Sequence, residues 1–256
     1  MLAELKMRLE ADKPDFGYYQ SSNLQGVLME QIDSGYAEAL HEQGLKPYSQ
    51  FLLQNGHQEK EWIVKTFTQE AYQQMMLPLM KGEFTDFVLE KKQIHVRICS
   101  KELRTMSRKE LLQEFYHGTN EKYFDIAFLS PTAFKSNSRY VMIPDVRYIV
   151  QSLMNKYSAS STDMEMYDED TLEQLTDNTD IVRYRLQSTV FPLEAVKIPS
   201  FRGEMTLRVG GTETMARYMR LLLRFGEYSG VGIKTAMGMG GFKLKEREKY
   251  NDGQRE

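Results

Sequence analysis

A glycine-rich stretch near the end of the sequence is the part of this chain best suited to hold a phosphate. Residues 228–241 read Tyr-Ser-Gly-Val-Gly-Ile-Lys-Thr-Ala-Met-Gly-Met-Gly-Gly, with five glycines, one lysine and one threonine. Glycine reaches positive φ at little cost and has no Cβ, so such a loop can turn tightly and present several backbone N–H groups together. N–H groups beside Lys234 suit phosphate oxygens. The stretch predicts a phosphate-binding loop; the alternative is a hairpin or bulge that only turns the chain.

The surroundings of this stretch exclude two familiar nucleotide-binding loops. A Walker A loop ends in Gly-Lys-Ser/Thr after a four-residue spacer and continues into a helix, and the sequence has neither feature. A dinucleotide fingerprint follows a strand, whereas here a helical segment comes first and the strand-like Phe242-Lys243-Leu244 comes after. The candidate phosphate contacts are Gly230, Gly232, Lys234, Thr235, Gly238 and Gly240.

A histidine at a helix end is a candidate for proton transfer. His41 lies in residues 40–49, Leu-His-Glu-Gln-Gly-Leu-Lys-Pro-Tyr-Ser, where Gly44 stops a helical segment. An imidazole titrates near neutral pH and can serve as base or acid; the alternative is a surface histidine that satisfies helix-terminal carbonyls. Lys46 could place positive charge on a transition-state phosphate, or it could be a solvated turn residue before Pro47.

The composition limits the classes of protein to consider. The chain has 256 residues, enough for one large domain or two small ones, and no apolar run approaches the roughly 20 residues that span a bilayer. Its N-terminus alternates charges and lacks the apolar centre of a signal peptide. The single Cys99 leaves no internal disulfide and no cysteine zinc cluster, and the four histidines lack helical zinc-site spacing. We therefore expect a cytoplasmic protein with no membrane segment, metal or other cofactor.

Charge is spread unevenly along the sequence, although the net charge is only −3. Residues 159–181 hold eight acids and no base, whereas residues 197–249 hold eleven bases and five acids. A basic region beside an acidic insertion is typical of a protein that binds a polyanion on one face. The alternative is a set of solvated helix faces and an acidic loop.

The first half of the sequence predicts a strand, helices, two strands, a helix and further extended segments. Apolar residues alternate with charged ones from Ala3 to Glu10, which is the period of a half-buried strand. Helices are expected from about Asn23, over 36–43, over 69–80, and after the capping box Ser107-x-x-Glu110. Strands are expected over 48–53, 62–68, 86–89 and 94–100.

The second half repeats this order. Strands are expected over 123–129, 139–143, 181–189 and 204–209, with a turn at Ser130-Pro131-Thr132. Helices are expected over 145–157 and from the Thr212 cap to Tyr228, with a buried stripe of Met215, Met219, Leu222 and Leu223. Two βαββαβ-like halves predict an α+β fold of two tandem ferredoxin-like modules, as in RNA-recognition motifs, over residues 1–119 and 120–256. Neither half has the aromatic sequences of RNA-recognition motifs, so this fold alone does not specify RNA.

Three segments together resemble one family, the CRISPR-associated repeat-specific endoribonucleases (Cas6) of the RAMP superfamily. The first is residues 40–49, similar to the family's helix-terminal histidine followed by Gly-x-Lys-Pro and an aromatic. The second is Phe-Leu-Ser-Pro-Thr-Ala-Phe-Lys at 128–135, similar to the segment that opens the family's second module. The third is the glycine-rich stretch 230–241. In this order and spacing the three segments span nearly the whole chain.

The resemblance implies a metal-independent endoribonuclease that cuts CRISPR precursor RNA within each repeat to give crRNA. The 2′-hydroxyl beside the scissile phosphate would attack, leaving a 2′,3′-cyclic phosphate and a 5′-hydroxyl. The implied partner is CRISPR repeat RNA, with transient hand-off to a CRISPR effector complex, and the implied enzyme is a monomer or homodimer.

The resemblance also suggests roles for particular residues. His41 would transfer protons and Lys46 would stabilise charge on the phosphate, while Tyr18 or Tyr19 would supply a second proton-transfer group, as a family tyrosine does in some members. Contacts to the RNA backbone are expected from the glycine-rich loop and from basic side chains; Lys135, Arg139 and Arg202 are the main candidates, with Lys156, Arg208, Arg217, Arg220 and Arg224 beside them.

Two other kinds of function are open at this point. One is a non-catalytic RAMP-fold RNA-binding subunit of a CRISPR effector complex, in which replacing His41 would change nothing. The other is a phosphate-loop enzyme that acts on a nucleotide, for which a nucleotide would raise the melting temperature.

We predict that cleavage of repeat RNA persists in excess EDTA. The RNA's own 2′-hydroxyl supplies the nucleophile, and the sequence shows no Cys/His or clustered-carboxylate metal site. The measurement is a gel assay of repeat RNA incubated with the protein in EDTA. Cleavage that is lost in EDTA and restored by Mg²⁺ or Mn²⁺ would contradict the metal-free mechanism.

Overall fold

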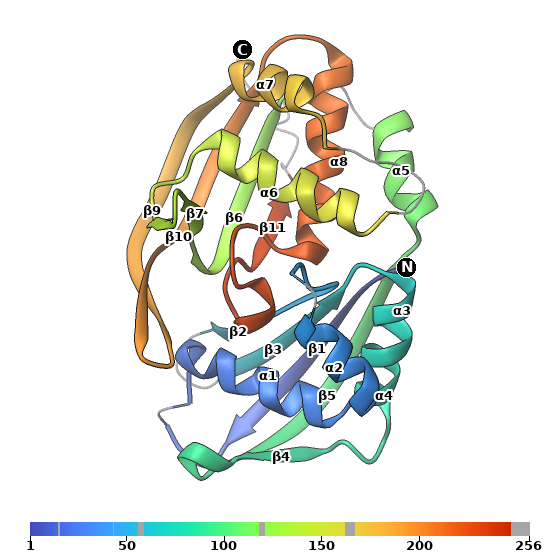
Figure 1. Ribbon diagram of the computed structural model, residues 1–256, viewed down its shortest axis with the longest axis vertical. Helices are drawn as coiled ribbons and strands as arrows, with labels where there is room; N and C mark the ends of the chain where they lie inside the picture. The colour runs from blue at the N-terminus through green and yellow to red at the C-terminus, as the bar shows by residue number, and fades with distance from the viewer. Residues whose placement is uncertain (15, 43, 56–58, 118–120, 162–166, 247–256) are drawn as a thin grey trace, which may run out of the picture.

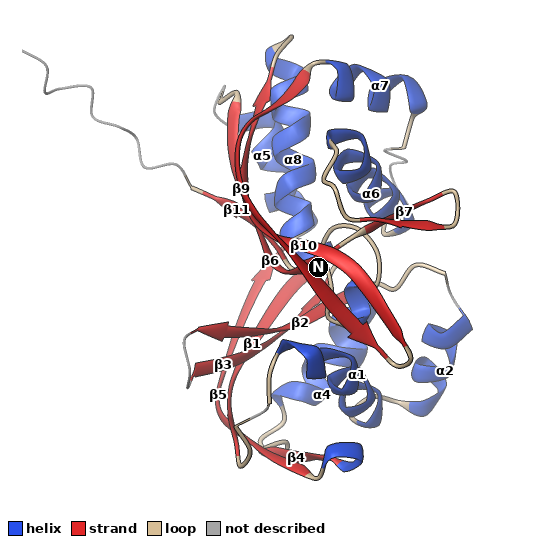
Figure 2. Ribbon diagram, turned by 90° about the vertical axis from the view of Figure 1, so that its left-hand side faces the viewer, coloured by secondary structure: helices blue, strands red, loops and turns tan. Residues whose placement is uncertain are grey.

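Two modules of similar topology are stacked one above the other in the computed structural model (Figure 1). The structure describes residues 1–14, 16–42, 44–55, 59–117, 121–161 and 167–246. Helices lie on one side of each sheet, and Figure 2 shows them on the same side in both modules. The predicted tandem ferredoxin-like fold is confirmed.

The first module is built on a five-stranded sheet of order β2-β3-β1-β5-β4. Strands β2, β3, β1 and β5 reproduce the ferredoxin-like order, and β4 adds a short antiparallel edge to β5. The elements are β1 (Leu2–Ala11), the 3-10 turn η1 (Tyr18–Gln20), α1 (Ser21–Glu30), α2 (Ser34–Glu42), β2 (Tyr48–Asn55), β3 (Glu59–Thr66), α3 (Gln69–Ala71), the π-helical turn η2 (Tyr72–Met76), α4 (Leu77–Met80), β4 (Asp86–Leu89), the 3-10 turn η3 (Glu90–Lys92) and β5 (Ile94–Met106).

The second module has a four-stranded sheet of order β11-β6-β10-β9 and a separate two-stranded hairpin, β7–β8. Between the modules, α5 follows the capping box, in which Glu110 N–H donates to Ser107 Oγ and Ser107 N–H to the Glu110 carboxylate, as predicted. The elements are α5 (Arg108–His117), β6 (Tyr123–Thr132), β7 (Phe134–Ser136), β8 (Arg139–Val141), α6 (Val146–Ala159), α7 (Glu169–Asp177), β9 (Thr179–Leu193), β10 (Val196–Val209), α8 (Glu213–Ser229), the 3-10 turn η4 (Thr235–Met237) and β11 (Phe242–Lys245).

The alternation of apolar and charged residues along β1 gives the half-buried strand that the sequence predicts. Ala3, Leu5, Met7 and Leu9 are all buried under the helices of the first module, and the charged residues between them face the other side of the sheet. In the second module, Thr212 caps α8 by accepting from the Met215 N–H, also as predicted.

Three details differ from the sequence-based expectation. The turn at Ser130-Pro131-Thr132 is wrong, because β6 runs on to Thr132; Pro131 is tolerated there since the pairing with β10 shifts register at this point. The acidic insertion contains α7, which is capped by Asp168 and buries Leu172 and Leu175. On α8, Met215 is only partly buried, and Ala216 lies in the core instead.

The predicted module boundary, 119/120, falls within residues 118–120, outside the described residues, and stays a prediction. Just before it, α5 packs against α8 of the second module. Leu111 of α5 lies in the second module's core, and Glu114 pairs with Arg220 of α8 at 2.8 Å.

The C-terminal end of α8 joins the two modules. A helix leaves its last carbonyls without intrahelical partners. Here the Glu227 carbonyl accepts from Lys65 Nζ of β3 at 2.5 Å and the Tyr228 carbonyl from Ser49 Oγ of β2 at 2.7 Å, both from the first module. The Ser229 carbonyl accepts from Lys156 Nζ of α6 at 3.2 Å. Cations beside a helix C-terminus also offset its partial negative charge.

Lys156 is buried and has no carboxylate partner in the described part of the chain. Besides Ser229, its ammonium donates to the Gly230 carbonyl at 3.0 Å and to Thr235 Oγ1 at 3.4 Å. Burial lowers the pKa of Lys156 to about 7. The residue therefore holds the start of the glycine-rich loop against α6.

We predict that Lys156 makes the free energy of unfolding depend on pH. Below pH 7 the lysine is protonated in both states. Between the folded pKa near 7 and the unfolded value near 10.5, the unfolded chain holds one more proton. Stability should therefore rise with pH across this window by up to about 1.4 kcal/mol per pH unit. The Lys156→Met variant should lack this rise in urea unfolding at pH 7, 8 and 9.

Lys109→Met is the matched control, because Lys109 is exposed on α5. A stability difference between parent and Lys156→Met that stays constant with pH would show that Lys156 does not titrate in this range.

Candidate functional site

His41 lies exposed in the last turn of α2. The helix starts after Asp33, whose carboxylate accepts from the Tyr36 N–H at 3.1 Å and whose carbonyl accepts from the Ala37 N–H at 2.9 Å. Leu40 is the buried residue that anchors the other end of the helix. These two anchors leave the imidazole open to a ligand.

Lys46 folds back onto the same helix end. Its ammonium donates to the Leu40 carbonyl, and burial lowers the pKa of Lys46. Because Leu40 is the chain neighbour of His41, this bond holds the lysine close to the histidine. Both predicted residues of the 40–49 segment therefore lie at the end of α2.

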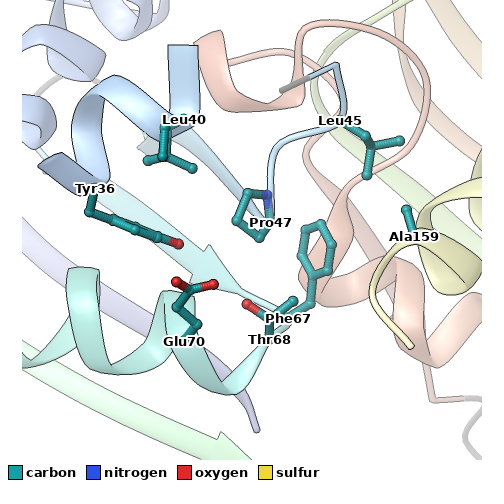
Figure 3. Close-up of a pocket in the computed structure, with 9 residues that line it drawn as sticks. Tyr36, Leu40, Leu45, Pro47, Phe67, Thr68, Glu70 and Ala159 are labelled. Carbon is teal, nitrogen blue, oxygen red and sulfur yellow. The ribbon is translucent and has the colours of Figure 1, made fainter. Parts of the chain in front are cut away.

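A pocket of about 250 Å³ opens beside this helix end (Figure 3). Its walls come from α2, from the segment that leads into β2, from the β3–α3 connection and α3, and from the end of α6, so both modules contribute. The lining residues are Tyr36, Ala39, Leu40, Leu45, Pro47, Phe67, Thr68, Glu70 and Ala159. The sequence does not predict this pocket, because no local pattern links residues so far apart in the chain.

Tyr18 and Tyr19 lie elsewhere. They form η1, which packs against β2, β9 and the start of α1, and the Tyr18 hydroxyl donates to the Val190 carbonyl at 3.5 Å. The chain enters α1 at the left of Figure 1, whereas α2 lies to the right. The two rings meet edge to face, with centroids 5.8 Å apart. The structure therefore places this pair beside the β9–β10 hairpin and not beside His41.

The glycine-rich loop is packed between the modules, and within residues 230–241 only Lys234 is exposed. Figure 1 shows it reaching from α8 and β11 down to β2. The expectation of a row of N–H groups facing solvent does not hold for most of its length, because these groups bond inside the protein. Four of these N–H groups donate to backbone carbonyls: Gly230 to that of Gly226, Val231 to that of Gly240, Ile233 to that of Ala133, and Gly240 to that of Pro131. Two donate to hydroxyls: Gly232 to that of Ser152 and Gly241 to that of Ser130.

Close approach of backbone explains why these positions are glycine. Gly232 and Gly240 have φ of +79° and +67°, and a Cβ on them would lie 2.3 Å from the Ala133 carbonyl oxygen and 2.1 Å from that of Val231. Gly238, at φ +112°, sits against Ser21 of α1. On the first module, the buried Gln50 donates to the Ala236 carbonyl at 3.1 Å. The glycine-rich loop thus joins the two modules, and Lys234 is its exposed tip.

The predicted basic contacts divide between two faces. Lys135 and Arg139 are exposed on the β7–β8 hairpin, which turns through Asn137 and Ser138 at positive φ and projects on the same side as α2 and α6 (Figure 2). Arg202 is exposed on β10 on the helix-free face of the sheet, and it donates to Gln187 at 3.3 Å. Arg202 therefore lies on a different face from Lys135 and Arg139.

Several further basic residues are engaged within the protein. Lys156 is buried, as described above. Arg220 pairs with Glu114 and Glu121 at 2.8 and 3.1 Å, and Arg224 pairs with Glu227 at 3.1 Å. Arg208 pairs with Asp180 at 2.5 Å. These ion pairs explain why a local excess of bases in the sequence does not translate directly into a basic surface.

The remaining histidines lie away from α2 where they are described. His95 on β5 bonds Asp86 at 2.9 Å, His117 is exposed at the end of α5, and His57 lies outside the described residues. Among the described residues, no three Cys, His, Asp or Glu side chains converge as a metal site. None of the described helices is long and apolar enough to cross a bilayer.

Two tandem ferredoxin-like modules define the structural class, and solved structures share this fold. A Cas6 product complex matches with a TM-score of 0.76 at 22% identity, covering 96% of this chain and 100% of that one. A Thermus thermophilus Cas6 matches with a TM-score of 0.68 at 22% identity, covering 96% and 98%. At this level of identity the likeness concerns the fold.

Sequence comparison identifies the family. Residues 126–242 match the model of the family described as CRISPR-associated endoribonuclease Cas6. A protein of that name from Streptococcus thermophilus is 38% identical over 224 residues, covering 87% of this chain and 90% of the relative. One from Mycobacterium tuberculosis is 36% identical over 247 residues, covering 95% and 78%. The chain belongs to the CRISPR-associated endoribonuclease Cas6 family, which confirms the predicted resemblance.

We predict that Gly240→Ala lowers the free energy of unfolding by about 2 kcal/mol or more, because alanine is strained at this φ and its Cβ would displace the Val231 carbonyl. Gly26→Ala is the control: a Cβ there meets nothing within 4 Å on the exposed side of α1, so stability should rise by about 0.5–1 kcal/mol. Urea unfolding measures both. A Gly240→Ala variant as stable as the parent would mean that the loop does not need its glycine there.

Proposed function

We propose that this chain cleaves CRISPR precursor RNA within its repeats, by attack of a 2′-hydroxyl on the adjacent phosphate. The observation that carries the proposal is that Lys46 bonds the helix end on which His41 lies exposed, in a member of an endoribonuclease family. The products would be a 2′,3′-cyclic phosphate and a 5′-hydroxyl. The second sequence-based function, a nucleotide-dependent enzyme, has no support from the family.

The chemistry needs proton transfer and charge stabilisation. His41 is exposed, so its imidazole can reach the 2′-hydroxyl as a base or the departing 5′-oxygen as an acid. Lys46 would place its ammonium on the phosphate as negative charge develops. Its bond to the Leu40 carbonyl holds it near His41 before RNA binds, which lowers the cost of ordering it.

For the second proton-transfer group, the sequence offers Tyr18 or Tyr19. Tyr18 and Tyr19 pack beside the β9–β10 hairpin, so we assign proton transfer to His41 and treat the tyrosines as a packing pair that contacts the hairpin.

RNA would reach His41 across the side that carries α2, α6 and the β7–β8 hairpin. Lys135 and Arg139 of the β7–β8 hairpin are exposed there and would meet phosphates. Lys234, the exposed tip of the glycine-rich loop, would be a further contact. Each such contact contributes a salt-dependent share of the affinity. Because the net charge is −3, this local cluster and not the overall charge would attract the RNA.

Other sequence-based predictions belong to the same proposal and await experiment. These are the metal-free mechanism, the cytoplasmic location, the monomeric or homodimeric state, and hand-off of crRNA to an effector complex. The non-catalytic alternative, an RNA-binding subunit, differs from the proposal in one measurable way, since it requires no His41.

We predict that His41→Ala slows cleavage of repeat RNA by at least ~10², as expected for loss of a general acid–base group. Affinity for an RNA with a single 2′-deoxy nucleotide just upstream of the cut should change little, because that RNA binds without a nucleophile. Gel assays and filter binding measure the two quantities.

His117→Ala is the matched control, since His117 is also exposed in the last turn of a helix. Unimpaired cleavage by His41→Ala would remove His41 from the mechanism. Cleavage of the 2′-deoxy RNA would mean that water attacks instead.

A further inference from the structure

The pocket beside His41 combines apolar walls with three polar side chains, of which Thr68 is engaged as the cap of α3. Leu45, Pro47 and Phe67 form one side, and the side chains of Tyr36 and Glu70 point into the same space from α2 and α3 (Figure 3). At about 250 Å³ it is smaller than a typical drug-sized site, and it suits a single planar ring system.

The Tyr36 hydroxyl is buried and has no hydrogen-bond partner among the described residues. Buried hydroxyls in native proteins nearly always have one, so this group needs an explanation. Glu70 lies near enough for its charge to act on the phenol: burial and the Glu70 carboxylate together raise the pKa of Tyr36. The two groups nevertheless form no hydrogen bond, which leaves a donor and an acceptor facing the same pocket.

The position of the Glu70 carboxylate beside an RNA-cleaving site needs an explanation, because the negatively charged phosphates of RNA repel it. The direct reason is recognition of a base through its N–H donors. Sequence-specific RNA recognition acts mainly on unstacked bases, which are held by apolar or aromatic walls and read on their Watson–Crick edges.

We propose that this pocket binds one unpaired guanine of the repeat RNA, next to the cut, with Glu70 and Tyr36 reading its Watson–Crick edge. The inference rests on the proposed function for its substrate. Guanine presents N1–H and N2–H side by side, which match the two oxygens of one carboxylate, and O6 next to them, which accepts from the Tyr36 hydroxyl.

The other bases fit this donor and acceptor arrangement less well. Adenine and cytosine each place a ring nitrogen acceptor beside their single amino group, so one carboxylate oxygen would face a lone pair. Uracil has one N–H between two carbonyls. Glu70 therefore selects for guanine by repulsion as well as by attraction.

The position of the pocket ties the base to the chemistry. Leu40 lines the pocket, and its carbonyl holds Lys46; His41 is the next residue. A base held there would keep its own backbone close to both catalytic side chains. Glu70 and Tyr36 thus act as specificity residues that place the scissile phosphate, and take no part in the bond changes.

The test replaces each guanosine of the repeat RNA in turn by inosine, which lacks the 2-amino group. Affinity is measured with the non-cleavable 2′-deoxy repeat, so that the result does not depend on activity. One unpaired guanosine near the cut should show a loss of about tenfold or more with the parent protein, the size expected for a hydrogen bond to a charged group. With Glu70→Gln the parent RNA should bind more weakly, and inosine at that position should cost little more.

Controls separate this role from a structural one. Glu38→Gln, an exposed carboxylate on α2 outside the pocket, should keep the full inosine effect. Tyr36→Phe should keep its melting temperature, because the hydroxyl has no partner to lose, and should weaken binding of the guanosine RNA.

Two results would overturn the inference. One is a binding profile in which no unpaired guanosine near the cut responds to inosine; the other is an inosine effect of equal size in the parent and in Glu70→Gln. A protein that shows the Glu70-dependent effect without cutting RNA would refute the proposed cleavage and leave the base pocket standing.

Discussion

The C-terminal end of α8 and the loop that follows it are the joint on which the rest of the structure depends. A helix end with unpaired carbonyls is costly to bury, and this one is buried because Lys65, Ser49 and Lys156 each donate to one of its last carbonyls. Two of these donors lie in the first module and one in the second. The same bonds that satisfy α8 therefore fix how the modules sit against each other.

The joint also explains the position of the candidate site. Ser49 belongs to β2, which begins right after Lys46 and Pro47, so docking of β2 on α8 places the end of α2 against the second module. The pocket beside His41 takes Ala159 from α6 as one of its walls. A site built this way exists only when the modules are docked, and its shape depends on a loop whose glycines are far from the histidine in sequence.

Part of the charge in the second module holds the fold together. Arg220 and Arg224 of α8 pair with acids on α5 and α8, and Lys156 is buried among carbonyls. Partly buried pairs of this kind are costly to break and tie elements together. Exposed bases remain available for RNA, among them Lys135 and Arg139 of the β7–β8 hairpin and Arg202 of β10, in a protein whose net charge is slightly negative.

The sequence by itself determined the elements that rest on local signals. Alternation set β1, the Ser107 and Thr212 caps started α5 and α8, and the repeated order of elements gave two ferredoxin-like modules, because period and capping depend on neighbours in the chain. Three resembling segments pointed to the family. Only the tertiary structure decided that these segments meet. Ser130, Pro131 and Ala133 accept hydrogen bonds from N–H groups of the glycine-rich loop. The Ser49 hydroxyl donates to the Tyr228 carbonyl at the end of α8. It also turned the loop inward, separated Tyr18 and Tyr19 from His41, and set Tyr36 opposite Glu70. The physical reason is that the bonds which satisfy a buried loop, and the walls of a pocket, come from residues far apart in sequence, whose proximity no local pattern records.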